Sequence, residues 1–275
     1  MSDKETPAKL IDIDKVFEEK NPELKKIIPK FLIKYLKRIT HQDEINEFIV
    51  NNSHIFGIEY AEAIVKNFGA RYIINGEENI PKEGRFVFAA NHPLGGMDGM
   101  VFVAAVGKFF SQLKFPVNDI LMNLKNLNSI FLPVNKHGGH PKEAARLIDE
   151  AYASDAQMLM FPAGLVSRRK KGIIRDLEWK KTFVTKAKQH KRSIIPVHIS
   201  GENTNFFYSL ANWRKRLGIK ANIEMLYLAD ELYQQYNKTI VITFGKPIPS
   251  EKLNDGTAPY DWAQKIREEV YSLKK

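Results

Sequence analysis

Apolar and polar positions alternate along the chain in a way that predicts a core of short strands and amphipathic helices. Short apolar runs rich in β-branched and aromatic residues predict strands at residues 85–91, 130–134, 157–161, 193–199, 223–228 and 239–244. Helical spacing of apolar residues predicts helices near residues 99–110, 141–153, 178–190 and 260–273. Because these strands and helices alternate, we expect an α/β fold with a mixed, mostly parallel sheet that helices flank on both faces.

A basic amphipathic helix is predicted ahead of this α/β region. Apolar residues recur at helical spacing between Leu24 and Ile39, with lysines and arginines between them, and Pro29 either kinks the helix or marks its start. The helix either packs on the core with a solvated lysine face or lies at a membrane surface. We therefore expect an N-terminal helical, membrane-facing extension over residues 1–70 and an α/β domain over residues 71–275.

The composition narrows the class of protein. With 275 residues, the chain fits one large domain or one domain with an appendage. There is no cysteine, which excludes disulfides, thiolate metal ligands and a cysteine nucleophile. The first ten residues are polar and lack the apolar core of a signal peptide, so we predict a cytoplasmic protein. The longest lightly charged stretch, residues 86–107, contains Pro93 and Asp98, so we expect no membrane-spanning helix.

The net charge of +10 is unevenly distributed. Residues 168–192 hold eleven lysines and arginines against two acids, and residues 23–39 hold six against one. Both clusters favour an anionic partner, for which nucleic acid, lipid headgroups and an acidic carrier protein all qualify. No recognised nucleic-acid-binding motif is present, so a nucleic-acid partner is not expected, although a basic binding module without catalysis remains an alternative.

The residues best suited to chemistry lie in the stretch 91–99, where a predicted strand ends and a helix begins. Open α/β sheets commonly build sites at such positions. His92 can accept a proton near neutral pH, and a carboxylate such as Asp98 can orient the imidazole. The two are six residues apart, so they can meet only if Gly95 and Gly96 let the chain turn back. The alternative is a core histidine beside an aspartate that caps a helix.

Two further loops follow predicted strands. In residues 161–168, Gly164 permits close backbone approach and Arg168 offers a fork for phosphate or carboxylate, although a plain surface turn is the alternative. His137 and His140 suggest a metal site, but two histidines fall short of the three protein ligands usual for catalytic zinc, so we expect no metal. The sequence also lacks the G-x-S-x-G, G-x-x-x-x-G-K-[ST] and G-x-G-x-x-G motifs, which argues against serine hydrolases, P-loop proteins and dinucleotide enzymes.

Taken together, these stretches resemble the lysophospholipid acyltransferase family, which includes 1-acylglycerol-3-phosphate acyltransferases. The first family block, an Asn-His motif closed by an Asp, matches Asn91, His92 and Asp98. The second, third and fourth blocks are similar to residues 130–135, 161–168 and 195–197. The resemblance implies the fold of glycerol-3-phosphate acyltransferases and makes the region 71–275 an acyltransferase domain.

The resemblance also implies a mechanism and a set of site residues. In the family, the histidine removes a proton from the acceptor hydroxyl, which then attacks a thioester carbonyl, so His92 is the expected general base and Asp98 its partner. The expected substrate-binding residues are Asn91, Gly95, Gly96, Asn135, Lys136, Phe161, Pro162, Gly164, Ser167 and Arg168. No cofactor or covalent enzyme intermediate is expected, because an acyl carrier protein or coenzyme A thioester supplies the acyl group and a good leaving group.

The chain departs from the family pattern on the acceptor side. Five residues rather than four separate His92 from Asp98, Ala163 replaces the usual acid of the third block, and the second block offers Asn135 and Lys136 in place of the usual arginine. The first block is most similar to a subgroup linked to ornithine and glycine lipids and to putative hemolysins. The resemblance therefore implies that the acceptor is an amino-acid lyso-lipid, such as an N-acylated amino acid with a free hydroxyl, with lysophosphatidate as the alternative.

The expected function is acyl transfer to the hydroxyl of a lyso-lipid at an anionic membrane surface. The protein would be cytoplasmic and peripheral, on the inner face of the cell membrane, and the aromatic and cationic stretch 203–216 would suit lipid headgroups or form an ordinary amphipathic helix. Alternatives are an N-acyltransferase that acylates an amino acid, a hydrolase that uses the same histidine and aspartate to activate water, and the basic binding module.

Overall fold

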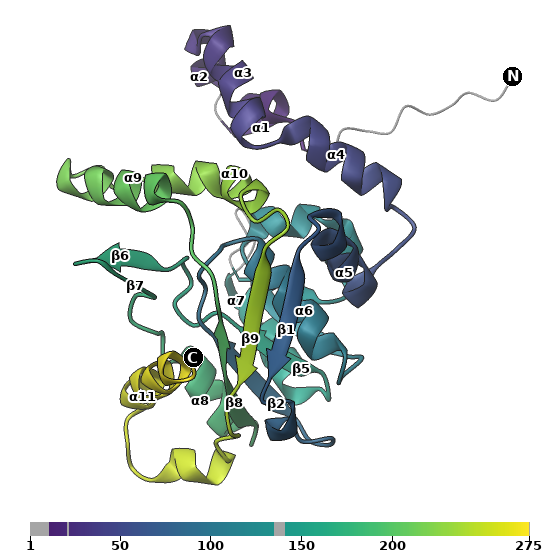
Figure 1. The fold of residues 1–275 in the computed structure, drawn as a ribbon, viewed down its shortest axis with the longest axis vertical. Helices are drawn as coiled ribbons and strands as arrows, with labels where there is room; N and C mark the ends of the chain where they lie inside the picture. Colours follow the sequence, from purple (N-terminus) through teal and green to yellow (C-terminus); the bar gives the residue numbers. More distant parts are fainter. Residues whose placement is uncertain (1–10, 21, 135–140, 275) are drawn as a thin grey trace, which may run out of the picture.

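The computed structural model describes residues 11–20, 22–134 and 141–274. Its centre is a seven-stranded sheet with the strand order β1-β9-β8-β2-β5-β3-β4 (Figure 1). The strands are β1 (Arg71–Asn75), β2 (Phe86–Ala90), β3 (Leu113–Val117), β4 (Phe131–Pro133), β5 (Gln157–Met160), β8 (Ser193–Ile199) and β9 (Thr239–Phe244). Neighbouring strands run parallel except β8 and β9, which are antiparallel. The predicted mixed, mostly parallel sheet is confirmed.

Helices cover both faces of this sheet. The α-helices are α1 (Ile13–Lys20), α2 (Pro22–Ile27), α3 (Lys30–Ile39), α4 (Gln42–Asn51), α5 (Gly57–Asn67), α6 (Met97–Gly107), α7 (Pro141–Ala153), α8 (Thr182–Gln189), α9 (Asn205–Arg216), α10 (Leu228–Tyr233) and α11 (Pro259–Ser272). Tyr60 of α5 and Phe102 of α6 share one core cluster with Phe88, while Phe183 of α8 shares the other with Val87. Because Val87 and Phe88 are consecutive in β2, they point to opposite faces, and both faces of the strand are buried.

Shorter elements complete the chain. They are the 3₁₀ helices η1 (Glu77–Asn79), η2 (Asp119–Asn123), η3 (Lys125–Leu127), η4 (Ile223–Tyr227) and η5 (Ser250–Asn254), and the antiparallel hairpin of β6 (Arg168–Lys170) and β7 (Ile173–Arg175). The sequence pattern did not predict this hairpin, nor β1 and β3. Each of these strands contains a lysine or an arginine, so none of them forms the apolar run on which the strand predictions relied.

The strand predicted at residues 223–228 is wrong, because this segment forms η4 and the start of α10. A strand interpretation assumes that the apolar positions face the core. Instead, Glu224 is fully buried while Leu226 is 51% exposed. Glu224 forms ion pairs with Arg168 and Arg214, so buried charges help to fix this segment, together with the apolar contacts of Met225 and Leu228.

The first four helices stand apart from the sheet, whereas α5 packs against α6 (Figure 1). Pro29 separates α2 from α3 and directly precedes the first residue of α3, Lys30, so the predicted basic helix consists of two helices. No helix in the described part of the chain is long and apolar enough to cross a bilayer. The division of the chain at residue 70 stays a prediction, as does the membrane-facing role of residues 1–70.

Candidate active site

Three neighbouring strand ends bring the predicted motifs together. β2 lies between β8 and β5, and both neighbours run parallel to it. Residues 91–98 follow β2, residues 161–168 follow β5, and residues 200–204 follow β8. Because the carboxyl ends of parallel strands meet at one edge of a sheet, these three loops are neighbours. We call them together the catalytic corner.

His92 and Asp98 form a hydrogen-bonded pair on the loop after β2. Nδ1 of His92 lies 2.9 Å from Oδ2 of Asp98. Gly95 has a φ of +88°, which turns the chain so that residues six positions apart can meet. The fully buried Asp98 carboxylate also accepts a hydrogen bond from the Leu94 N–H at 2.8 Å. When Nδ1–H donates to Asp98, Nε2 of the partly exposed imidazole is the nitrogen that can accept a proton.

The imidazole of His92 stacks on Phe161, the first residue after β5. The two ring centroids are 3.9 Å apart and the ring planes differ by 15°. Phe161 in turn contacts the rings of Phe102 and Phe115 at centroid distances of 5.6 and 5.3 Å. The loop after β5, which contains the third block, therefore supplies an apolar wall that fixes the plane of the His92 ring.

Helix α10 packs directly on the two glycines of the first motif. A Cβ atom at Gly95 would lie 2.8 Å from Leu228, and one at Gly96 would lie 3.3 Å from Leu232. A larger residue at Gly95 would therefore displace α10 as well as strain the turn. This packing accounts for both glycines, and the substrate-binding roles expected for them stay predictions.

A second buried carboxylate, Asp176, holds the backbone of His92. Its Oδ1 accepts from the His92 N–H at 3.2 Å and from the hydroxyl of Ser167, and its Oδ2 accepts from Nε1 of Trp179 at 2.9 Å. The Ser167 N–H donates to the carbonyl oxygen of His92 at 2.7 Å. Burial raises the pKa of Asp176, although these hydrogen bonds act in the opposite direction. Asp176 thus connects the loop after β2, which contains His92, to the loop after β5, which contains Ser167.

Asn91 and Arg168, both expected to bind substrate, make hydrogen bonds within the protein. Nδ2 of Asn91 donates to the carbonyl oxygen of Ile199 at 2.9 Å, and its Oδ1 accepts from the Ile199 N–H at 2.7 Å. Nη2 of Arg168 donates to the buried Glu224 at 2.9 Å. Burial lowers the pKa of Arg168, and Glu224 opposes this effect. Both side chains fix neighbouring segments, and their substrate-binding roles stay predictions.

A lysine lies over the loop after β5. The Lys180 N–H donates to the carbonyl oxygen of Pro162 at 3.0 Å. Gly164 has a φ of +68°, and a Cβ atom there would lie 3.1 Å from Nζ of Lys180. The absence of a side chain at Gly164 therefore leaves room for the ammonium group of this exposed lysine. Roles of Pro162, Gly164 and Ser167 in substrate binding stay predictions.

Some of the predicted site residues cannot be placed. Asn135, Lys136, His137 and His140 lie outside the described residues. Within residues 11–20, 22–134 and 141–274, no group of three or more His, Asp or Glu side chains is arranged to hold a metal ion.

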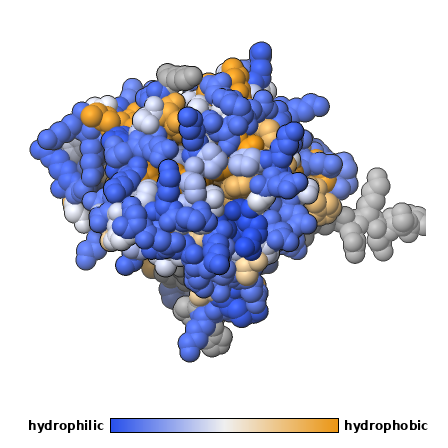
Figure 2. Space-filling model, turned by 90° about the horizontal axis from the view of Figure 1, so that it is seen from below, coloured by the Kyte–Doolittle hydropathy of each residue, from blue (hydrophilic) through white to orange (hydrophobic). Residues whose placement is uncertain are grey.

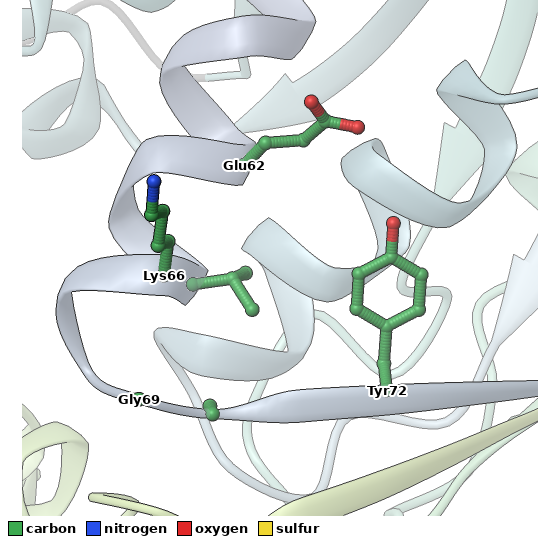
Figure 3. Close-up of a pocket in the computed structure, with 6 residues that line it drawn as sticks. Glu62, Lys66, Gly69 and Tyr72 are labelled. Carbon is green, nitrogen blue, oxygen red and sulfur yellow. The ribbon is translucent and has the colours of Figure 1, made fainter.

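A surface hollow lies away from the catalytic corner. It is lined by Glu62 and Lys66 of α5, by Gly69, and by Tyr72 of β1, which stands across from the helix (Figure 3). In the sheet, β9 and β8 separate β1 from β2, the strand that leads to His92. The hollow is therefore not part of the candidate active site.

Comparison with known proteins identifies the family. The family model described as "Acyltransferase" matches residues 15–275, which is nearly the whole chain and includes the catalytic corner. The chain belongs to this acyltransferase family. The resemblance expected from the four sequence blocks is confirmed, and the protein is an acyltransferase.

Two curated relatives of the acyltransferase align over almost their full length. The chain is 48% identical to the lyso-glycine lipid O-acyltransferase of Bacteroides thetaiotaomicron, covering 96% of this chain and 97% of the relative. It is 44% identical to the protein of the same name from Phocaeicola vulgatus, covering 96% and 95%. Among solved structures, the 1-acyl-sn-glycerophosphate acyltransferase PlsC from Thermotoga maritima matches with a TM-score of 0.48 and 16% identity, covering 87% of this chain and 95% of that one.

The structure adds residues that the sequence pattern did not single out. Asp176 and Lys180 lie within the basic run 168–192, and Asp176 is one of only two acids there. Asn203 follows β8 and is 5% exposed. No sequence signal marks it, since its burial depends on tertiary contacts.

Proposed function

We propose that this acyltransferase moves a fatty acyl chain from a thioester to the hydroxyl of a lyso-lipid whose headgroup is an N-acylated amino acid such as glycine. The observation that carries the proposal is the pairing of His92 with the buried Asp98 at 2.9 Å, at a strand end in a member of this family. The names of the two curated relatives, both lyso-glycine lipid O-acyltransferases, support this acceptor.

In the proposed reaction, Nε2 of His92 removes the proton of the acceptor hydroxyl. The resulting oxygen nucleophile attacks the thioester carbonyl, a new ester bond forms, and the carbon–sulfur bond breaks. The departing thiolate takes the proton back from the imidazolium, so the enzyme returns to its starting state. Asp98 stabilises the imidazolium and holds its tautomer while Phe161 holds the ring plane.

The acyl donor is proposed to be an acyl carrier protein or coenzyme A thioester, bound near the basic run 168–192. Not all of this charge is available, because Arg192 is fully buried and donates to backbone carbonyl groups. The exposed cations of the run include Lys170, Lys171 and Lys180. Lys180 lies over Gly164 at the third motif, where it can attract the phosphate of either carrier toward His92.

A membrane surface is the proposed place of the reaction. One end of the molecule exposes apolar side chains on α2, α3, α9 and neighbouring loops, which we call the α3–α9 surface: Ile27, Phe31, Leu32, Phe206, Trp213, Leu217, Ile219 and Leu226. Tyr227 links the α3 part of this surface to the α9 part. Its hydroxyl hydrogen-bonds to the Tyr35 hydroxyl of α3 at 2.7 Å, and its ring packs edge-on against Phe206 of α9. Viewed from the opposite end, the molecule is largely hydrophilic (Figure 2).

Cations accompany the apolar side chains of the α3–α9 surface. Lys30, Lys34, Lys215, Arg216 and Lys220 are all exposed on the same elements. Exposed apolar residues among cations suit the headgroup region of an anionic membrane, where apolar groups enter the acyl boundary and cations meet lipid phosphates. We propose that the protein is peripheral on the inner face of the cell membrane, where this surface would hold it beside its lipid acceptor.

The proposed function is tested by supplying an acyl thioester with each of three acceptors: N-(3-hydroxyacyl)glycine, lysophosphatidate and free glycine. We expect thiol release and ester formation with the first acceptor. The His92→Gln variant should lose about 10²–10⁴-fold in rate, the usual contribution of a general base. His190→Gln is a matched control, because His190 also pairs with an aspartate, Asp149, at 3.0 Å.

Other outcomes would redirect the assignment. Thiol release that no acceptor stimulates would indicate a hydrolase. Acylation of free glycine would indicate an N-acyltransferase, and preference for lysophosphatidate would overturn the proposed acceptor.

A further inference from the structure

Asn203 is a buried asparagine whose side chain has no hydrogen-bond partner. Within the described part of the chain, neither Nδ2 nor Oδ1 finds a partner, although the residue is only 5% exposed. Buried carboxamides are almost always hydrogen-bonded, and an unsatisfied one costs about 1–3 kcal/mol. Asn91, in the same corner, is buried to a similar extent and has both atoms bonded to Ile199. The contrast with Asn91 indicates that the side chain of Asn203 is free to hydrogen-bond to a ligand.

The position of Asn203 is fixed rather than loose. Its backbone N–H donates to the Tyr208 hydroxyl at 3.0 Å. The next residue, Thr204, donates its N–H to the buried Glu231 of α10 at 2.7 Å. The backbone that carries the carboxamide is therefore held in place by both α9 and α10, as a binding group requires.

The loop that carries Asn203 touches the loop that carries His92. β8 is paired with β2, and a Cβ atom at Gly201 would lie 2.9 Å from the side chain of Leu94. The N–H of Leu94 is the group that donates to Asp98. Helix α10, which holds Thr204, also covers Gly95. The unpartnered carboxamide therefore belongs to the catalytic corner.

A carboxamide has one group that donates and one that accepts, which is the complement of a secondary amide. An N-acylated amino acid carries such an amide close to its hydroxyl, whereas a glycerol-based lyso-lipid carries an ester, which has no N–H. We propose that Asn203 binds the amide of the acceptor and selects N-acyl amino acid lyso-lipids over ester-linked ones. This inference rests on the proposed function and names a residue that determines its specificity.

The test compares two acceptors that differ in one atom group: N-(3-hydroxyacyl)glycine and the ester in which glycolate replaces glycine. We expect the wild type to favour the amide by about tenfold or more in kcat/KM, as sites that hydrogen-bond a substrate reject analogues that lack the group. In Asn203→Leu, which keeps the branching at Cγ and removes both polar atoms, this preference should disappear through a raised KM for the amide acceptor. Asn203→Asp, which keeps the oxygen and loses the N–H donor, should retain part of it.

Stability separates a binding role from a structural one. Because Asn203→Leu removes an unpaired polar group, its midpoint of urea unfolding should stay the same or rise. The matched control is Asn126→Leu, since Asn126 is also buried but donates to the Ile55 carbonyl at 2.6 Å. That control should lose stability and keep the amide preference.

Three results would overturn the inference. An unchanged amide preference in Asn203→Leu would show that Asn203 does not read the acceptor. Equal losses with both acceptors, together with a lower unfolding midpoint, would show a structural role. If the wild type acylates neither acceptor, the proposed function fails and this inference fails with it.

Discussion

The catalytic corner and the α3–α9 surface use their side chains in opposite ways. In the corner, charged groups are buried and paired, as Asp98 is with His92 and Asp176 with Ser167 and Trp179. At the α3–α9 surface, large apolar groups are exposed, with Phe31 at 74% and Trp213 at 62%. Each arrangement is unfavourable in a free, monomeric protein unless something compensates it.

The difference indicates that the two regions affect different steps, the chemical reaction in the corner and binding to lipid at the α3–α9 surface. Buried, paired charges hold reacting groups in fixed geometry, which affects the rate of the chemical step. If the protein binds a membrane as proposed, exposed apolar groups among cations affect how much of it resides at the lipid surface. Substitutions of the groups that support His92 should therefore change kcat with soluble acceptors, and substitutions at the surface should change activity only when the acceptor is presented in vesicles.

The largest effect is expected from Asp98→Asn. An amide at this position cannot stabilise the imidazolium of His92 and can favour the wrong tautomer, so kcat should fall by about 10³-fold or more. Asparagine offers one oxygen in place of two, so either the Leu94 N–H or the Gly99 N–H loses its acceptor, and stability should fall by about 1–3 kcal/mol with the fold retained. Steady-state thiol release with a soluble acceptor measures the loss.

The control for Asp98→Asn is Asp149→Asn, which alters another aspartate–histidine pair that lies outside the corner. Its kcat should stay within about twofold of wild type, as expected for a change at an exposed pair. An equal loss of activity in both variants would contradict the special role given to Asp98.

A smaller effect is expected from Asp176→Asn, which acts on His92 through the backbone. The asparagine must turn an NH₂ group toward a donor, either the Ser167 hydroxyl with the His92 N–H or Nε1 of Trp179. We expect kcat to fall by about 10–100-fold with little change in KM, and stability to fall by about 1–3 kcal/mol. A stability loss with unchanged kcat well below the unfolding temperature would reduce Asp176 to a purely structural residue.

Much of the corner was predictable because each motif directly follows an apolar strand. β2 is short and fully apolar, β5 is apolar after Gln157, and parallel strands bring the residues after them to one edge. The pairing of His92 with Asp98 depended on a turn at the glycines, and the positive φ of Gly95 provides it. The strands β2, β4, β5, β8 and β9 follow from the same apolar runs.

Other features were beyond sequence reasoning for physical reasons. Asp176 acts on His92 across 84 positions of the chain, and this distance leaves no trace in local spacing. The burial of Glu224 by two arginines reversed the apolar pattern on which the strand prediction relied. Asn203 looks like any loop asparagine until the chain has folded around it.

At the α3–α9 surface, the double variant Phe31→Ser and Trp213→Ser should weaken binding to anionic vesicles by about tenfold or more, because two large apolar groups no longer enter the lipid. Co-sedimentation with vesicles measures this, and kcat with a soluble acceptor should be unchanged. The control pair Phe56→Ser and Ile73→Ser removes apolar groups that are 59% and 51% exposed elsewhere. Equal losses of vesicle binding in both double variants would contradict the assignment of the membrane-binding face.

The smallest effect on activity is expected from His198, a histidine of β8 that shares the sheet with the corner but pairs with no carboxylate in the described part of the chain. Burial, with a smaller contribution from Lys274, lowers the pKa of His198 to about 4. Since the unfolded chain has the ordinary pKa near 6.5, the unfolded state binds the proton more tightly between these values. The neutral, buried His198 therefore does not reduce the free energy of unfolding above about pH 6.5. As the pH falls from 6.5 toward 4, it reduces this free energy progressively.

Substitution of His198 by Leu should remove this part of the pH dependence. Between pH 7 and pH 4.5, wild type should lose about 2.5 kcal/mol more unfolding free energy than His198→Leu, the amount that the two pKa values imply. Urea unfolding at both pH values measures the difference, and kcat at pH 7 should be nearly unchanged, since a neutral buried histidine takes no part in proton transfer there. Equal slopes in the two proteins would mean that His198 is protonated in the folded state.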